Sequence, residues 1–152
     1  MSLERVKAHL AQYHLEDRIM EFPVSSASVA EAASAIGCTQ KEIAKTLSFM
    51  LGEKPILIVV AGDCKVNNAK FKAEFHTKAK MIPFESVEVL IGHAVGGVCP
   101  FGVNENVSVY LDSSLQNLKT LYPACGSANS AVCLSLAELE LASCYEKWID
   151  VC

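Results

Sequence analysis

The chain has 152 residues, of which 51% are hydrophobic and 20% charged, and its formal net charge is -4. This composition is typical of a globular protein that is long enough to bury a core, and it excludes a disordered chain. The negative charge argues against broad nonspecific binding to nucleic acid but leaves room for a local basic patch.

Helices and a strand hairpin are predicted in the first half of the chain. An amphipathic repeat predicts a helix over the first dozen residues, and residues 19–24 predict a short strand. Ser28 and Thr39 each have a glutamate three residues later, and this capping-box pattern predicts two helix starts. The strongest strand signal is a β-hairpin formed by residues 45–51 and 55–61.

Shorter elements are predicted in the second half. They are a helix that begins near Asn67 or Asn68, a strand at 81–82, a helix at 86–91, strands at 107–111, 118–125, 131–135 and 148–151, and a last helix begun by a capping box at Ser135. Strands occur as hairpins as often as they alternate with helices. We therefore expect an α/β fold: a single domain over residues 1–152, with a mixed, mostly antiparallel curved sheet or barrel surrounded by helices.

Seven cysteines lie at positions 38, 64, 99, 125, 133, 144 and 152. None forms a Cys-x-x-Cys pair, so the pattern does not predict a zinc site. The longest apolar runs are much shorter than the ~18 residues of a membrane helix. No signal peptide is predicted at the N-terminus. We therefore expect a cytoplasmic protein with free thiols, no membrane partner, no metal and no cofactor.

Lys45 is the most informative single residue of the hairpin. Because side chains alternate along a strand, Lys45 shares a face with Leu47, Phe49 and Leu51. A lysine on an apolar face extends to solvent, finds a partner or lines a pocket. The sequence leaves all three interpretations open.

The stretch Gly92-His-Ala-Val-Gly-Gly-Val-Cys-Pro-Phe-Gly102 holds half of the glycines of the chain. Its spacing fits neither the dinucleotide fingerprint nor the phosphate loop. Adjacent glycines allow the backbone to approach a ligand, and consecutive amides can bind an oxyanion. The alternative is a plain turn between a helix and a strand.

Two other features carry weaker hypotheses. His93 and Cys99 suggest a cysteine nucleophile, but a buried cysteine that acts as a small hydrophobe explains the same pattern. The segment 65–80 carries five lysines against one glutamate. It is either a contact for a phosphate backbone, with Lys65, Lys70 and Lys72 as the candidate residues, or a solvated helix face.

Three segments together resemble the YbaK/ProX family, which contains free-standing Cys-tRNA(Pro) and Ala-tRNA(Pro) deacylases and the editing insertion of bacterial prolyl-tRNA synthetases. They are Ala44-Lys-Thr-Leu47, the glycine-rich stretch 92–102 and Gly126-Ser-Ala-Asn-Ser-Ala-Val132. The resemblance implies a compact α/β domain with a cleft for the 3′ end of an aminoacylated tRNA. It also implies that an aminoacyl-tRNA synthetase is a candidate partner.

The resemblance assigns the functional lysine to Lys45 and the glycine loop to Gly96 and Gly97. The substrate-binding positions that it implies are Thr46, Val98, Pro100, Phe101, Gly102, Gly126, Ser127 and Asn129. The chain departs from the cysteine deacylases in the second loop, where they carry Gly-Lys-Arg-Gly-x-Asp and this chain has residues 126–131 without the basic pair and the aspartate.

These features predict a hydrolase that edits mischarged aminoacyl-tRNA, with Cys-tRNA(Pro) or Ala-tRNA(Pro) as its substrate. Lys45 would hold a phosphate or the aminoacyl carbonyl, and amides around Gly96 and Gly97 would bind the oxyanion. The ribose hydroxyl of the substrate would orient the attacking water. The alternative is a module that binds an amino acid or an aminoacyl-tRNA without hydrolysing it, because a fold does not fix a function.

Overall fold

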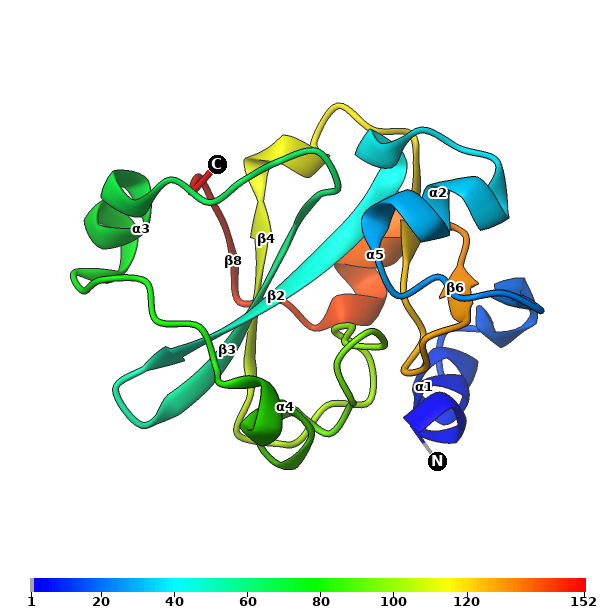
Figure 1. The fold of residues 1–152 in the computed structure, drawn as a ribbon, viewed down its shortest axis with the longest axis horizontal. Helices are drawn as coiled ribbons and strands as arrows, with labels where there is room; N and C mark the ends of the chain where they lie inside the picture. The colour runs from blue at the N-terminus through cyan, green and yellow to red at the C-terminus, as the bar shows by residue number, and fades with distance from the viewer. Residues whose placement is uncertain (1) are drawn as a thin grey trace.

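The computed structural model describes residues 2–152 and has a six-stranded sheet in the order β7-β5-β2-β3-β4-β8, with β1 and β6 paired separately (Figure 1). The strands are β1 (Ile19–Glu21), β2 (Ile43–Leu51), β3 (Lys54–Ala61), β4 (Ser108–Asp112), β5 (Thr120–Pro123), β6 (Ser130–Val132), β7 (Leu134–Ser135) and β8 (Lys147–Ile149). The helices are α1 (Ser2–Ala11), α2 (Val29–Ile36), α3 (Asn68–Phe75), α4 (Phe84–Ile91) and α5 (Leu136–Ser143), with 3-10 turns η1 (Glu16–Arg18), η2 (Gln40–Glu42) and η3 (Ser113–Leu115).

The sheet is mixed, as the sequence predicts. Its longest ladder is the antiparallel β2–β3 hairpin, which runs from the pair Ala44 and Ala61 to the pair Leu51 and Lys54. The parallel pairs β2–β5, β3–β4 and β4–β8 are shorter. The α/β class with a mixed sheet flanked by helices is therefore confirmed.

The central strand β3 separates two apolar layers. Leu57, Val59 and Ala61 point into the larger layer, which also receives residues of α1, α4 and α5. The alternate residues Ile56, Ile58 and Val60 point into a smaller layer covered by Phe71 of α3. Both sides of β3 are thus buried, which explains its uninterrupted run of aliphatic residues.

The predicted helix starts are confirmed by their caps. The side chain of Ser28 accepts the Glu31 amide, and Ser135 accepts the Glu138 amide. Asn67 caps α3 in the same way by accepting the Lys70 amide. Each cap satisfies an amide that the helix itself leaves without a partner.

Three predicted elements are different in the structure. The Thr39 capping box begins only a 3-10 turn, because the chain enters β2 directly after Glu42. Residues 81–82 make one isolated bridge, Met81 to Phe49, instead of a strand. Residues 131–135 divide into β6 and β7, which belong to different sheets.

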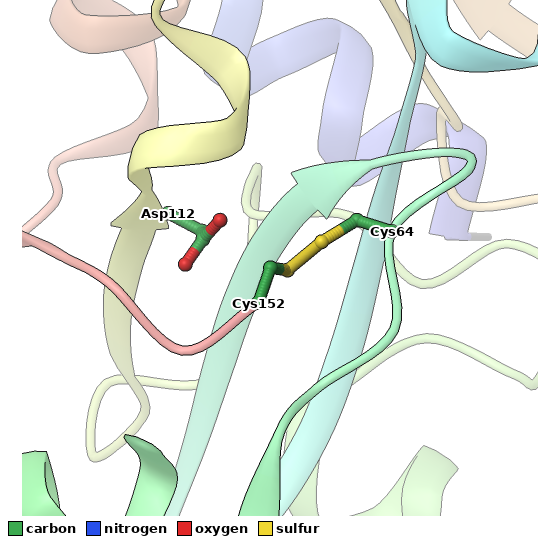
Figure 2. Close-up of side chains that lie close together, drawn as sticks. All are labelled: Cys64, Asp112 and Cys152. Atoms are coloured by element: carbon green, nitrogen blue, oxygen red, sulfur yellow. A yellow bond between two sulfur atoms is a disulfide. The ribbon is translucent and has the colours of Figure 1, made fainter.

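The expectation of free thiols is wrong for two cysteines. Cys64, in the loop after β3, forms a disulfide with Cys152 in the segment that follows β8 (Figure 2). The other five cysteines are free. The sequence separation of 88 residues gave no local spacing signal for this pair. Within the described residues, no helix is both long and apolar enough to cross a membrane.

Candidate active site

A gap along one edge of β2 forms the site. β5 pairs with β2 only at Ile43 and Ala44, and farther along the strand Ser48 accepts the Ile82 amide at 3.2 Å. Between these contacts, no described residue pairs with this edge of β2. A cavity of about 110 Å³ opens there. Its lining residues are Ser26, Ala27, Ser28, Val29, Ala32, Ile43, Ala44, Lys45, Thr46, Gly96, Val98, Tyr122, Ala124, Ser130 and Ala131.

Lys45 lies at this cavity and has a partner. Its half-buried ammonium donates a hydrogen bond to the carbonyl of Cys64 at 2.7 Å. Burial lowers the pKa of the ammonium, Asp63 opposes this effect, and Lys65 adds to it. Of the three interpretations that the sequence left open, the structure supports a partner and a place in the cavity wall.

The glycine-rich stretch contains a tight turn that lines the same cavity as Lys45. The Gly97 amide donates to the Ala94 carbonyl at 3.0 Å and closes the turn. Gly96 has a φ of 96° at its third position, where glycine is favoured. Gly96 and Val98 line the cavity. Because the Gly97 amide already has an acceptor, it is not available to a ligand in this conformation.

Gly97 instead fixes the position of the second loop. Its carbonyl accepts the Gly126 amide at 2.8 Å. A Cβ atom on Gly97 would lie 2.4 Å from both the Gly126 carbonyl carbon and the Ser127 nitrogen. The two loops therefore touch through their backbones, which requires glycine at this position.

The remaining predicted positions lie behind or beside the cavity. Pro100 and Phe101 are buried, and Gly102 adopts a φ of 63° against the Arg5 backbone. Ser127 contacts Ser130 and Asn129 within the second loop, with hydroxyl oxygens 2.5 Å apart in the first pair. Asn129 donates to the Phe22 carbonyl at 3.1 Å. These residues support the loops, whereas Thr46 and Val98 line the cavity directly.

A second, more apolar cavity of about 300 Å³ adjoins the first. Thr46, Gly96 and Val98 line both cavities and form their common wall. Phe84 and Met81 stand at the second cavity with 75% and 58% of their surfaces exposed. The Thr46 hydroxyl is buried and has no partner among the described residues, so it is free to bond to a ligand at this wall.

His93 and Cys99 do not support a cysteine nucleophile. Both are fully buried, and neither lines the two cavities. Burial raises the pKa of the Cys99 thiol to about 12. His93 Nε2 lies 2.6 Å from the Phe101 carbonyl, so this nitrogen carries a proton and cannot accept one. The Cys99 thiol contacts the same carbonyl at 3.7 Å.

The lysines of segment 65–80 that were predicted to contact tRNA are exposed, but they differ in their partners. Lys70 donates to Asp150 at 3.1 Å and to the Cys152 carbonyl at 2.7 Å, so it holds the C-terminal residues. Lys65 and Lys72 are exposed, and no ion pair involves them within the described residues. Lys65 lies close enough to Lys45 to affect its pKa.

One group of side chains has the composition of a metal site. The Cys64 and Cys152 sulfurs and a carboxylate oxygen of Asp112 lie within 4.8 Å of one another. The two sulfurs are bonded to each other (Figure 2). The Asp112 oxygens accept the Ser114 and Val151 amides at 2.9 and 2.8 Å. The group therefore acts as a structural junction in this form of the chain.

Sequence reasoning did not assign eleven residues of the cavity wall to the site. They are Ser26, Ala27, Ser28, Val29, Ala32, Ile43, Ala44, Tyr122, Ala124, Ser130 and Ala131. The capping box at Ser28 identified a helix start but gave no sign that it faces the site. Ser26 links the segment 26–28 to the second loop, because its amide donates to the Ala128 carbonyl at 2.7 Å.

Comparison with known proteins gives a consistent result. YwhH of Bacillus subtilis, described as uncharacterized, is 47% identical over 153 residues, which is 100% of this chain and 98% of YwhH. The proline–tRNA ligase of Latilactobacillus sakei is 30% identical over 95 residues, or 60% of this chain and 16% of the ligase.

A solved structure provisionally described as a trans-editing enzyme for prolyl-tRNA synthetase has a TM-score of 0.88 and 26% identity, with 99% of this chain and 96% of that chain covered. The family model for the aminoacyl-tRNA editing domain matches residues 24–141, which include β2, the glycine turn and the second loop. The chain therefore belongs to the aminoacyl-tRNA editing domain family.

Proposed function

We propose that this protein hydrolyses the ester bond of a mischarged aminoacyl-tRNA in trans, with Ala-tRNA(Pro) or Cys-tRNA(Pro) as its substrate. The observation that carries this proposal is the common wall of Thr46, Gly96 and Val98 between a small cavity and a larger apolar one. An ester at this wall would place its aminoacyl group on one side and its terminal adenosine on the other.

The small cavity suits the aminoacyl group. Its volume of about 110 Å³ leaves room for a small side chain only, although larger residues such as Ile43 and Tyr122 stand among the alanine, serine and valine residues of its lining. Synthetases discriminate poorly between small apolar amino acids, so a second site that hydrolyses the wrong ester is chemically useful. Alanine and cysteine fit this size class.

The larger cavity suits the terminal adenosine. It is mostly apolar, and the exposed Phe84 ring offers a face on which a base can stack. Lys65 and Lys72, outside this cavity, are candidates for contacts with the phosphates of the acceptor strand.

Lys45 would hold a substrate oxygen without leaving its present partner. An ammonium has three N–H donors, and the Cys64 carbonyl uses one of them. The oxyanion would be bound by the amides of Gly96 and Val98, for which no acceptor exists among the described residues. The Thr46 hydroxyl would orient the ester, and the ribose hydroxyl would orient the water.

The test is a deacylation assay with Ala-, Cys- and Pro-tRNA(Pro). Wild type is expected to hydrolyse one or both mischarged esters and to spare Pro-tRNA(Pro). Lys45→Ala should lower the rate about 10²-fold, a loss of the order expected when one preorganised electrostatic group is removed from an active site. Lys54→Ala, at the far end of the hairpin, is the matched control and should retain full activity.

Phe84→Ala in the same assay should raise KM more than it lowers kcat, because stacking binds ground state and transition state alike. Equal rates for wild type and Lys45→Ala would disprove the role of the lysine. Tight binding of aminoacyl-tRNA with no loss of ester across the panel would instead indicate a binding module.

A further inference from the structure

The Cys64–Cys152 disulfide includes the residue whose carbonyl binds the Lys45 ammonium. The Cys64 carbonyl accepts the Lys45 ammonium at 2.7 Å, while the Cys64 sulfur is bonded to Cys152. Figure 2 shows Cys64 on the loop after β3 and Cys152 on the C-terminal segment. The disulfide therefore holds the side chain of Cys64, and the hydrogen bond from Lys45 holds its backbone carbonyl.

Few hydrogen bonds hold this loop, although the side chains of Cys64 and Val66 pack against the smaller apolar layer. It has no regular secondary structure between β3 and α3, and Asp63, Lys65 and Asn67 are exposed. The Cys64 amide donates to the Ala61 carbonyl at 3.0 Å, and the Asn67 amide donates to the Val151 carbonyl at 2.6 Å. The disulfide is thus the one covalent anchor of residue 64 to another segment, and it adds to these noncovalent contacts.

The disulfide joins two residues that are each partly exposed to solvent. Cys64 and Cys152 are both only partly buried, in contrast to Cys99 and Cys125. Thiol–disulfide exchange requires such access to a sulfur atom. The C-terminal segment keeps other anchors after reduction, since Lys70 holds the Cys152 carbonyl and Asp112 holds the Val151 amide.

We propose that Cys64 and Cys152 are a reversible thiol pair that controls the position of Lys45 and thereby the activity of the site. The expected effect of the thiol pair on the deacylation rate rests on the proposed function. The expected effect on the position of Lys45 does not. The oxidised pair fixes the carbonyl that positions the ammonium. The reduced pair releases the loop, so the ammonium loses its fixed place at the cavity.

The chemical step is an exchange with a small external disulfide or dithiol. In oxidation, the two cysteine thiols lose two electrons and two protons and form one S–S bond, while the small disulfide gains both and becomes two thiols. In reduction, a dithiol such as dithiothreitol supplies the two electrons and two protons and closes to its own disulfide.

The first experiment measures Lys45 itself. Oxidised protein and protein reduced with dithiothreitol are acetylated with an N-hydroxysuccinimide ester, and peptide mass spectrometry compares the labelling of Lys45 with that of Lys54. Mass spectrometry also verifies the redox state of the pair. Reduction should raise the labelling of Lys45 relative to Lys54 and should speed deuterium exchange in residues 62–67.

Variants separate the pair from other thiols. Cys152→Ser should label like reduced wild type whether or not dithiothreitol is present, and Cys64→Ser gives a second test from the other side of the bond. Cys144→Ser removes an exposed free thiol and should still respond to dithiothreitol like wild type. Unchanged Lys45 labelling and unchanged exchange on complete reduction would overturn the proposal.

The second readout is the deacylation rate. Reduction should lower it roughly tenfold and reoxidation should restore it, since misplacing a catalytic group by ~1 Å costs up to about 10²-fold. If Lys45 labelling responds but no ester is hydrolysed in either state, the proposed function fails and the thiol pair stands. If hydrolysis is equal in both states and labelling does not respond, the thiol pair fails and the proposed function stands.

Discussion

Lys45 combines partial burial with an uncharged hydrogen-bond partner. Its ammonium is half-buried at a cavity wall, and its only hydrogen-bond acceptor among the described residues is a neutral carbonyl. Among residues 2–152, no carboxylate forms an ion pair with it. A charge in this setting is available to a substrate oxygen, because a neutral carbonyl competes for it less than a carboxylate would.

The lowered pKa of Lys45 predicts a pH dependence. If the ammonium is the active form, kcat/KM should fall as the pH rises through this pKa, which lies below the ordinary lysine value because burial disfavours the charge. The measurement is kcat/KM for deacylation against pH, corrected for spontaneous ester hydrolysis.

Lys45→Arg is the matched variant for this profile. A guanidinium stays charged throughout the accessible range, so its residual activity should show no alkaline loss. The same alkaline loss in wild type and Lys45→Arg would assign the titration to another group.

Alternation along β2 was enough to single out Lys45, because period-two patterning depends only on the strand assignment. The occupied Gly97 amide was not predictable. Whether an amide is free depends on backbone angles in the turn, and the sequence Val-Gly-Gly-Val is compatible with several turn types. The prediction that glycine amides bind a ligand does not hold for Gly97 in this conformation, because its amide is occupied. For Gly96 it stays a prediction.

At the scale of elements, the contact between the glycine turn and the second loop shapes the cavity. The backbones of Gly97 and Gly126 meet through a 2.8 Å hydrogen bond. Gly96 meets the side chains of Ala27 and Ala128, where an added Cβ would lie 3.2 and 3.5 Å away. The loops are thus fitted to each other, and the cavity takes its width from this fit.

Gly97→Ala should destabilise the protein through overpacking, by roughly 1–3 kcal/mol. The new Cβ would meet backbone atoms at 2.4 Å, and backbone cannot rotate away as a side chain can. The measurement is the free energy of unfolding in urea. Gly52→Ala is the comparison, since its φ of 62° is strained for alanine but no atom lies within 4 Å. Gly97→Ala should cost more; an equal or smaller loss would contradict the steric argument.

Helices and hairpin strands were predicted well because caps and alternation are local signals. The capping boxes at Ser28 and Ser135 and the β2–β3 hairpin all depend on residues within a few positions of each other. The break at Cys133 between β6 and β7 depends on which distant strands each half pairs with. No local sequence pattern predicts that β6 pairs with β1 while β7 pairs with β5.

At the scale of the whole molecule, Asp112 joins the end of β4 to the C-terminal segment. Its carboxylate is fully buried and accepts the Ser114 amide at 2.9 Å and the Val151 amide at 2.8 Å. The disulfide lies beside it (Figure 2). Sequence order alone did not reveal this junction, because Asp112 lies 39 positions from Val151 and the two cysteines lie 88 positions apart.

Asp112→Asn should lower the free energy of unfolding by about 1–3 kcal/mol, since one of the two amides loses its acceptor and remains buried. The loss should be similar in oxidised and reduced protein if the carboxylate acts through these amides and not through the sulfurs. Glu105→Gln, an exposed carboxylate, is the control. A variant as stable as wild type would show that the junction is held by the disulfide alone.

The interrupted pairing along the edge of β2 also affects whether two copies of the protein can associate through this edge. A free strand edge is a template for pairing with another chain and a common origin of aggregation. Here the open stretch is limited to residues 45–47, with β5 at one end and segment 80–82 at the other. The glycine turn lines the same cavity as this open stretch. The fold thus offers main-chain groups to a small ligand while denying a neighbouring strand the length it needs to add itself to the sheet.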